Sequence, residues 1–398
     1  MIITIFYLIL CISGLALISS MYLISYIKNK NFHLNKFNEN YAPKCAVFVP
    51  CKHFFYDLKK NLESVLNQNY KGEYRTIFII ESENDESFTV VRDIVSNNKN
   101  AEYIIVGTAK RNGQKNHGIL KAIEKIENEN IGIEAYVFFD SDHFIPEESL
   151  TTLIQTLTIN DTEISTLHSH KKPRSIIPLG NTLYAMLNNY IYGFNTVSNQ
   201  AWGGSLAMRK ETYKKYKIDE IWPEALSHDC PINGLGAKIL FNPNCTPEEE
   251  RFFYTTASFI KWTKRQFTNW RLFSPKFWCL SFFSILANLF VIYSFLFVLI
   301  ENIIRKNFGL LLVVLSSYIV LSHIVLSLFL SFKMKNKVFW IIMHIFLIPV
   351  FLNALFISFS MSIFNNKIVW AGKKYIIGKN GKVLEIINLE TNEILLKN

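Results

Sequence analysis

The chain has 398 residues, of which 50% are hydrophobic and 33 are phenylalanine, and it carries a formal net charge of +10. This length allows one large or two modest domains, and the apolar composition is typical of a protein with membrane-spanning segments. The positive charge suits contact with an anionic membrane surface, and because no nucleic-acid-binding motif accompanies it, we exclude nucleic acid as a partner. The six cysteines lack metal-finger spacing, which indicates reduced thiols.

The N-terminal segment is a predicted membrane anchor. Residues 1–26 are almost wholly apolar and uncharged, which is long enough to span a bilayer. A cleaved signal peptide would have a basic start and a shorter apolar run, so we predict a retained anchor over residues 1–27. Lys28, Lys30 and Lys36 follow it and place the next region on the cytosolic side.

Residues 43–260 are predicted to form a cytosolic α/β domain, because apolar strand-like segments alternate with amphipathic helical segments. This rhythm is typical of a mainly parallel sheet with helices on both faces, in which ligands bind beyond the carboxyl ends of the strands. The predicted strands are residues 45–50, 75–82, 102–107 and 134–142, and the predicted helices are residues 57–68, 113–126 and 146–157.

The C-terminal part is predicted to be a transmembrane region of about three helices over residues 277–363. A basic and aromatic segment, 261–276, precedes it and is predicted to lie in the membrane interface. The tail, residues 364–398, has an Asn-Gly turn between apolar runs and is predicted to form a β-hairpin. Because the tail carries several lysines, the sequence does not decide on which side of the membrane it lies. Pro349 in the last candidate span allows that span to be either a single helix or a re-entrant hairpin. The candidate spans are residues 277–300, 308–331 and 338–363.

The strongest local signal is an acidic pair at the end of a predicted strand, Asp140 and Asp142. Positions two apart along a strand point the same way, so the two carboxylates converge on one point. They would repel each other without a cation or protons between them. Oxygen ligands suit Mg²⁺ or Mn²⁺, which can bridge to a diphosphate. The alternative explanation of so short a pattern is a solvated acidic turn.

Two other loops carry groups suited to a nucleotide. The predicted strand at 75–82 leads into Glu81, Glu83 and Asp85, which can accept hydrogen bonds from a base and a ribose. Lys115 lies at a predicted helix start between two glycines, where backbone N–H groups and the helix dipole favour a diphosphate. An ordinary charged loop also explains each pattern, and no Walker motif indicates an ATPase.

Downstream features extend the candidate site. Gly203 and Gly204 permit close approach of the backbone to a ligand. Asp229 lies at a predicted helix start, where it is either a plain N-cap or a general base for an acceptor hydroxyl. Gln266 and Trp270 lie four residues apart, on one face of the predicted interfacial helix, where they can line a pocket at the membrane surface.

Taken in this order, the motifs resemble family 2 glycosyltransferases, above all the membrane-bound ceramide glucosyltransferase-like group. That family has three aspartate positions followed by (Q/R)xxRW near a membrane span, and here the corresponding positions fall in ESEND, in DSD, at Asp229 and in QFTNW. The phrases VFVPCK, GQKNHG, AWGGSLAMR and VWAGKKY also resemble that family, so the likeness spans residues 43–375. Glu81, His228 and Asn269 depart from the pattern, and Asn269 stands in place of an arginine.

The resemblance implies an A-type glycosyltransferase fold and an inverting reaction with a divalent metal, Mg²⁺ or Mn²⁺. It places Asp140 and Asp142 on the metal and makes Asp229 the base. The donor side is then Glu81, Glu83, Asp85, Lys115 and Asp140, and the acceptor side is Trp202, Gly203, Gly204, Gln266 and Trp270. We expect a hexosyltransferase that moves a sugar from a nucleotide-sugar donor to the hydroxyl group of a membrane lipid. Its catalytic domain would face the cytosol from a bacterial inner membrane.

Three alternatives stay open. A processive polysaccharide synthase needs a translocation channel, for which three downstream spans are few. A polyprenyl-phosphate glycosyltransferase has a phosphate acceptor, which needs no base. A nucleotide-sugar-binding homologue without activity is the non-enzyme alternative, because the arginine of (Q/R)xxRW is absent. The acceptor lipid also stays open among ceramide, diacylglycerol, a hopanoid and a sterol.

Overall fold

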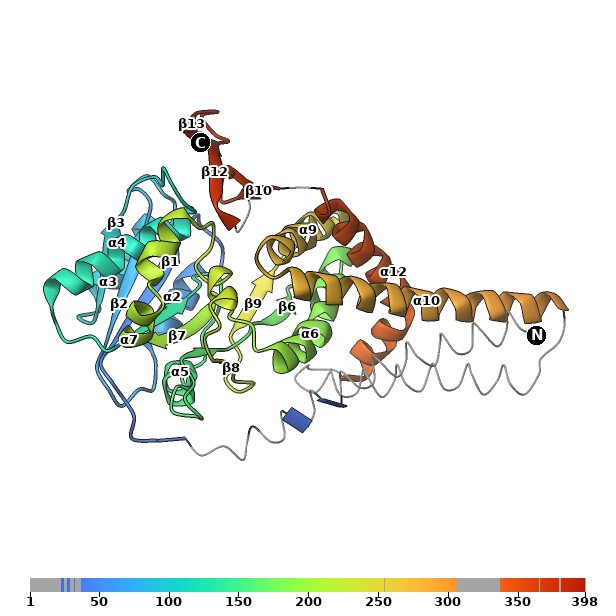
Figure 1. The fold of residues 1–398 in the computed structure, drawn as a ribbon, viewed down its shortest axis with the longest axis horizontal. Coiled ribbons are helices and arrows are strands. Elements are labelled where there is room, and N and C mark those ends of the chain that lie inside the picture. The colour runs from blue at the N-terminus through green and yellow to red at the C-terminus, as the bar shows by residue number, and fades with distance from the viewer. Residues whose placement is uncertain are drawn as a thin grey trace.

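The structure is a computed structural model in which an α/β domain, a helical region and a small C-terminal sheet lie together (Figure 1). The predicted span at 308–331 and nearly all of the predicted anchor at 1–27 lie outside the described residues. The described residues are 37–253, 255–305, 337–364, 366–378 and 381–397, with a few single residues between 23 and 32.

The α/β domain is built around a seven-stranded sheet. Its strands, in spatial order, are β3 (Ala101–Ile105), β2 (Tyr74–Ile80), β1 (Cys45–Cys51), β4 (Ala135–Phe139), β7 (Ser205–Arg209), β5 (Ile164–Thr166) and β8 (Ile239–Phe241). The first four run parallel to one another, and β5 pairs parallel with β8. Strand β7 runs antiparallel to both of its neighbours. The prediction of a mainly parallel sheet is therefore confirmed.

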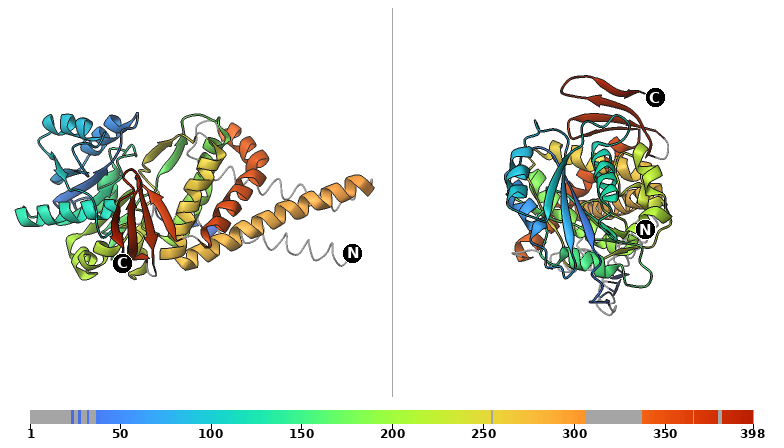
Figure 2. Two further views of the ribbon diagram at one scale, coloured as in Figure 1. Left: turned by 90° about the horizontal axis from the view of Figure 1, so that it is seen from above. Right: turned by 90° about the vertical axis from the view of Figure 1, so that its left-hand side faces the viewer.

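Helices cover both faces of this sheet (Figure 2). In β1, Val47 and Val49 enter a core with α2 (Leu58–Leu66), α3 (Phe88–Ser96) and α5 (Ser149–Thr156). Ala46 and Phe48 enter a second core on the opposite face, with α4 (Gln114–Glu129), α7 (Lys210–Lys215) and α8 (Ile218–Ile221). Because neither face meets water, the central strands are continuous apolar runs in the sequence.

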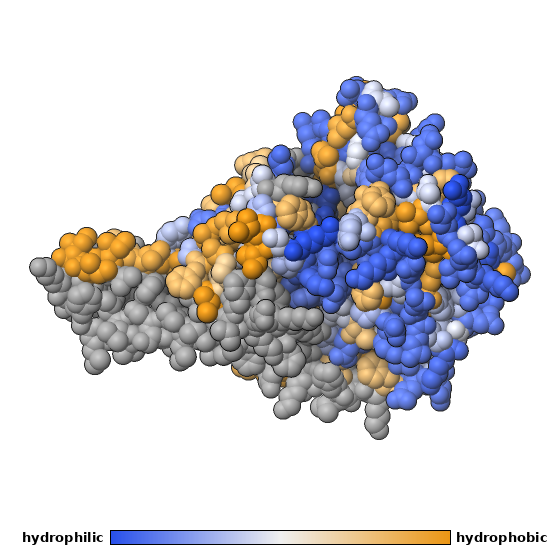
Figure 3. All heavy atoms as spheres, turned by 180° about the vertical axis from the view of Figure 1, so that it is seen from behind, coloured by the Kyte–Doolittle hydropathy of each residue, from blue (hydrophilic) through white to orange (hydrophobic). Residues whose placement is uncertain are grey.

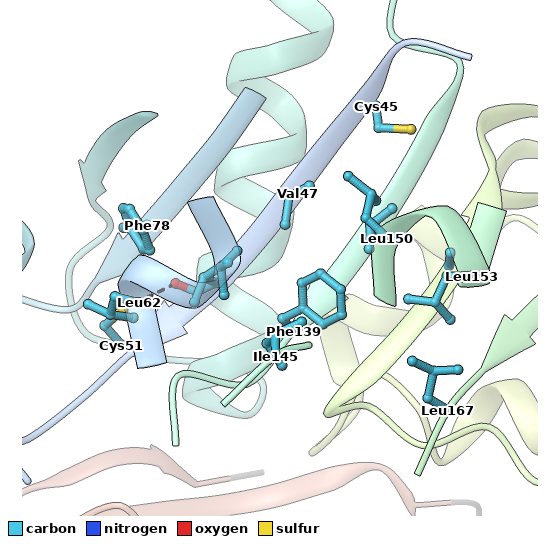
Figure 4. Close-up of a cluster of buried hydrophobic side chains, with 14 of the residues drawn as sticks. Cys45, Val47, Cys51, Leu62, Phe78, Phe139, Ile145, Leu150, Leu153 and Leu167 are labelled. Carbon is cyan, nitrogen blue, oxygen red and sulfur yellow. Dashed lines mark hydrogen bonds between the residues drawn. The ribbon is translucent and has the colours of Figure 1, made fainter. Parts of the chain in front are cut away.

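The first of these cores shows how closely the layers pack. Figure 4 shows Val47, Phe78 and Phe139 from three adjacent strands beside Leu62 and Leu150 from the covering helices. All five side chains are fully buried. This packing fixes the ends of β1, β2 and β4 relative to one another, and the candidate site lies at those ends.

The helical region consists of α6 (Leu179–Ser198), α9 (Thr256–Phe273), α10 (Pro275–Arg305) and α12 (Lys337–Ser362), which share a third core. The predicted interfacial segment lies in α9 and at the start of α10, and the predicted spans at 277–300 and 338–363 lie in α10 and α12. Helix α12 continues through Pro349, so the re-entrant break is not formed. Across the part of the chain that the structure describes, no helix has the length and apolar character needed to cross a bilayer.

The tail folds into a four-stranded antiparallel sheet, which is more than the single predicted hairpin. We call it the C-terminal sheet. It packs on Leu226 of the α/β domain and on Phe273 at the end of α9. Its strands are β10 (Lys367–Trp370), β11 (Lys373–Ile377), β12 (Val383–Asn388) and β13 (Ile394–Lys397).

Candidate active site

A cavity of about 650 Å³ lies at the carboxyl ends of the parallel strands, between the α/β domain, α9 and the C-terminal sheet. Glu83 and Asp85 are the predicted site residues that do not line it. Asp85 instead accepts hydrogen bonds from the backbone N–H groups of His53 and Ser87. The predicted residues that do line the cavity are Glu81, Lys115, Asp140, Asp142, Trp202, Gly203, Gly204, Asp229, Gln266 and Trp270.

The acidic pair follows β4 directly, and each carboxylate has a cationic partner. Lys115, from the first turn of α4, pairs with Asp140. Asp142 contacts His143 Nδ1 at 2.7 Å and an Arg251 guanidinium nitrogen at 3.0 Å. Burial raises the pKa of Asp140. Burial also tends to raise the pKa of Asp142, but the contacts with His143 and Arg251 outweigh burial and lower the pKa of Asp142 to about 2. Asp142 is therefore ionised at neutral pH.

His143 joins the two aspartates in a group whose ligand atoms all lie within 4.8 Å of one another. Burial opposes its protonation, but Asp142 and Glu249 raise the pKa of His143 to about 9. The two carboxylates are oxygen ligands that suit Mn²⁺ or Mg²⁺, and His143 can add a nitrogen ligand once a bound cation displaces its proton. The three cationic side chains gathered here also indicate that the group attracts positive charge. His143 was not predicted, although it directly follows the acidic pair.

A glycine turn joins this acidic group to Asp229. The Lys115 ammonium donates to the carbonyl of Gly203 at 3.1 Å, and the N–H of Gly203 donates to Asp229 Oδ2 at 2.8 Å. The carbonyl of Gly204 accepts from the N–H of Asp140 at 3.1 Å. A Cβ atom on Gly203 would lie 2.4 Å from His228 Cε1, so the turn requires glycine.

Asp229 lies in a loop, immediately before a 3₁₀ turn over Pro231–Gly234, rather than at the start of an α-helix. Its second oxygen accepts from the N–H of Cys230 at 2.8 Å. Burial would raise the pKa of Asp229, but the charge of Lys115 and the hydrogen bond from the Gly203 N–H lower it. An ionised carboxylate held by two backbone donors is suited to accept a proton.

A second charged wall of the cavity was not predicted. Strands β6 (His170–Pro173) and β9 (Glu248–Arg251) pair in parallel and place Lys171 opposite Glu249. Glu249 is 4% exposed and contacts Lys171 and Arg251, both at 2.7 Å. In the sequence, the run of charged residues 248–251 is typical of a solvent-exposed segment. Only the alternation of a strand places Glu249 and Arg251 on one inward face.

Helix α9 forms the side of the cavity nearest to α10 and α12. Gln266 and Trp270 line the cavity as predicted, and Arg265 and Asn269 line it with them. The Arg265 guanidinium lies 5.9 Å from the ring centroid of Trp370 and has no carboxylate within ion-pair distance among the described residues. Burial lowers the pKa of Arg265 to about 10. The helix therefore presents a cation to the cavity one turn before Asn269.

Comparison with known proteins agrees with this geometry. Residues 46–215 match the model of glycosyl transferase family 2. The fold is similar to that of a mannosyltransferase from Pyrobaculum calidifontis in complex with GDP-Man and Mn²⁺. The TM-score is 0.51 at 13% identity, and the match covers 89% of this chain and 99% of that one. A comparison with curated proteins gives no match.

Together, the mainly parallel sheet, the acidic cluster at its carboxyl edge and the family match define a glycosyltransferase of A-type fold. Its residues 46–215 are the part of the chain that matches the model of glycosyl transferase family 2. The predicted enzyme class is thus confirmed, and the ceramide glucosyltransferase-like group stays a prediction.

Proposed function

We propose that this enzyme transfers a sugar from a nucleotide-sugar donor to the hydroxyl group of a membrane lipid, with a divalent metal and with inversion at the anomeric carbon. The observation that carries the proposal is the Gly203–Gly204 turn. It contacts the donor-side pair of Lys115 and Asp140 through one set of hydrogen bonds and Asp229 through another. A base and a diphosphate site are therefore held against each other on one cavity wall.

The residues divide the chemistry as follows. Asp140 and Asp142 would hold Mg²⁺ or Mn²⁺, with His143 as a further ligand in its neutral form, and the metal would supply electrostatic stabilisation to a diphosphate. Lys115 would stabilise the leaving nucleoside diphosphate. Asp229 would take the proton of the acceptor hydroxyl as its oxygen attacks the anomeric carbon and the bond to the diphosphate breaks. A single displacement of this kind inverts the configuration at that carbon.

The lipid acceptor is supported by the apolar surface of α10, the helix that follows α9 in the chain. Large apolar side chains on α10 are exposed, among them Phe283 at 63% and Ile304 at 75%. Figure 3 shows hydrophobic residues along the upper side of the projecting end of the molecule. A contiguous apolar surface of this kind is typical of a membrane contact. We propose that α10 and α12 place the cavity mouth at the headgroups of a cytosolic leaflet, as in a bacterial inner membrane.

The test is lipid glycosylation in membranes supplied with labelled nucleotide sugars. Asp142→Ala and Asp229→Asn should each lower transfer by at least about 1000-fold, because one weakens donor binding and the other removes the base. Both variants should keep the thermal unfolding midpoint within a few degrees of wild type. Label in the lipid extract identifies donor and acceptor class together. Near wild-type activity in either variant would overturn the proposal.

A polyprenyl-phosphate acceptor is the second candidate, because Lys171, Arg251 and Arg265 bring three cations to the cavity. Such an acceptor is already ionised and needs no base. Asp229→Asn would then retain activity while Asp142→Ala lost it. The same pair of variants therefore separates a hydroxyl acceptor from a phosphate acceptor.

A further inference from the structure

We propose that the C-terminal sheet completes the nucleotide-binding end of the cavity, and that Lys373 is a positioning residue for a nucleoside diphosphate, acting through Glu81. This inference rests on the proposed function and deepens it. The sheet lies outside residues 46–215, which match the family model, so the match assigns it no role.

The sheet is fixed to the α/β domain and to α9 at several points. Tyr375 and Val383 are 1% exposed and pack with Leu226. A backbone bridge joins Lys382 to Ala225. The Lys382 ammonium also lies 2.9 Å from a carboxylate oxygen of Glu224. The sheet is therefore a wall of the site rather than a free tail.

Lys373 is the feature of this wall that packing does not explain. It is 2% exposed, and its ammonium lies 2.6 Å from Glu81 Oε1 and 3.0 Å from Gln114 Oε1. An apolar side chain of similar size would occupy such a place at a smaller desolvation cost. The buried ammonium is better explained by its effect on Glu81 and Gln114, both of which line the cavity.

Glu81 is held by three donors. Lys373 and Thr108 donate to Oε1, the latter at 3.0 Å, and Lys52 donates to Oε2 at 2.6 Å. Two lysines on one carboxylate leave a local surplus of positive charge, which favours an anionic ligand. The remaining lone pairs of a carboxylate fixed in this way can accept from the N–H groups of a base or the hydroxyl groups of a ribose.

The same strand also contacts the diphosphate side of the cavity. The backbone N–H of Gln114 donates to the Tyr375 hydroxyl at 3.4 Å. Gln114 is the first residue of α4, and the next residue, Lys115, pairs with Asp140. Strand β11 therefore contacts the carboxylate suited to a nucleoside and also the helix start suited to phosphates. A nucleoside diphosphate is the ligand class that spans both.

The test measures nucleotide binding directly on the full chain in detergent. Uridine, guanosine and adenosine diphosphates are titrated with Mn²⁺ into wild type, Lys373→Met and Lys373→Arg, and donor KM and kcat are then measured for the same proteins. Lys397→Met is the matched control, because Lys397 is an exposed lysine of the same sheet. Tyr375→Phe is a milder second variant, which keeps the packing and removes the bond to Gln114.

We expect Lys373→Met to weaken binding of the preferred diphosphate by at least about 10-fold, as for a lost charged hydrogen bond. Donor KM should rise more than kcat falls, Lys373→Arg should restore most of the binding, and Lys397→Met should bind as wild type does.

If Lys373→Met does not fold, the Tyr375→Phe variant decides the matter. Weaker nucleotide binding by Tyr375→Phe supports the role of the sheet, and wild-type binding by Tyr375→Phe overturns that role. Wild-type binding by a folded Lys373→Met also overturns the inference. Failure of the wild-type chain to bind any nucleoside diphosphate would instead refute the proposed function.

Discussion

At the residue scale, Gly203 is held tightly in the site. Its N–H bonds Asp229, its carbonyl accepts from Lys115, and a Cβ atom there would also lie 2.9 Å from Asp229 Cγ. A side chain must therefore move the carboxylate that we propose as the base. Placing a catalytic group wrongly by about 1 Å lowers rates by about 100-fold.

We therefore expect Gly203→Ala to lower kcat by about 100-fold and to destabilise the fold by about 1–3 kcal/mol, because the added Cβ atom overpacks the buried turn. Gly234→Ala is the matched control, because a Cβ atom at Gly234 meets nothing within 4 Å. Steady-state transfer assays on both variants provide the measurement. A fully active Gly203→Ala would show that Asp229 can shift without loss of function.

His228 gives the stability of the fold a defined pH dependence. It is 1% exposed, and burial lowers the pKa of His228 to about 3. Its pKa in the unfolded chain is about 6.5, so below that pH the unfolded state binds a proton that the folded state does not. Stability is then fully present above about pH 6.5 and decreases by about 1.4 kcal/mol per unit as the pH falls further.

The expected result is a lower thermal unfolding midpoint at about pH 5 than at about pH 7.5, with a smaller decrease in His228→Leu. His168, whose pKa burial also lowers, should contribute in the same direction, and His143, whose pKa is raised to about 9, in the opposite one, so the comparison with His228→Leu isolates His228. Differential scanning calorimetry at the two pH values measures both slopes. Identical slopes in wild type and variant would exclude His228 as a source of the pH dependence.

The limit of sequence reasoning at this scale is set by contacts between distant segments. Asp140 and Asp142 were predictable, because two positions on one strand fix where both carboxylates point. Glu249 and Lys171 were not predictable, because their pairing depends on β6 and β9 lying side by side, 78 residues apart. Glu83 and Asp85 lie in the expected loop, but only the folded loop decides which of its acids lines the cavity.

At the element scale, α9 lies between the cavity and the helices α10 and α12. It begins with a capping box of Thr255 and Ser258 and buries Phe259 and Phe267 in the helical core. That orientation directs Arg265 and Asn269 into the cavity, and Asn269 Oδ1 is buried without a hydrogen-bond partner among the described groups. The helix thus offers a cation and an acceptor to a ligand.

Arg265→Gln should lower transfer by roughly 10- to 100-fold, because it removes a partly desolvated positive charge next to the proposed diphosphate. Lys261→Gln, at an exposed position of the same helix, should have no effect. Initial rates at saturating donor compare the two. An equal loss in both variants would indicate that the helix acts through net charge alone.

The strands and helices from β1 to α5, apart from α3, were predictable to within a few residues, because their cores impose regular apolar periodicity on the chain. Helix α3 and the elements from β5 to β9 were not predicted. The direction of β7 was not predicted either, because the connection through α6, rather than the five residues of the strand, determines it. The C-terminal sheet exceeded the predicted hairpin, since β10 and β13 have exposed positions with little periodic signal.

At the scale of the whole molecule, the exposed apolar side chains of α10 predict that the protein binds to membranes. The exposed positions of α10 include Phe283, Ile300 and Ile304. Composition alone predicted membrane contact, but it could not decide which helix faces lie inside the third core and which remain outside it.

The full chain should float with anionic lipid vesicles in a density gradient at high salt, where charge contacts are screened. Substitution of Phe283, Ile300 and Ile304 by serine should lower the floating fraction severalfold, because the apolar area available to lipid decreases. Tyr103→Ser with Ile105→Ser, on the opposite end of the molecule, is the control. Unchanged flotation of the triple variant would contradict the assigned surface.

The reversed direction of β7 has a practical consequence. Because this strand begins at the edge where β1, β2 and β4 end, the site draws its loops from one rim of the sheet. The opposite rim, which includes the exposed turn around Lys99 between α3 and β3, contributes none of the side chains described for the cavity. That rim is where a fluorophore, a purification tag or an inserted reporter domain can be attached while the enzyme keeps working.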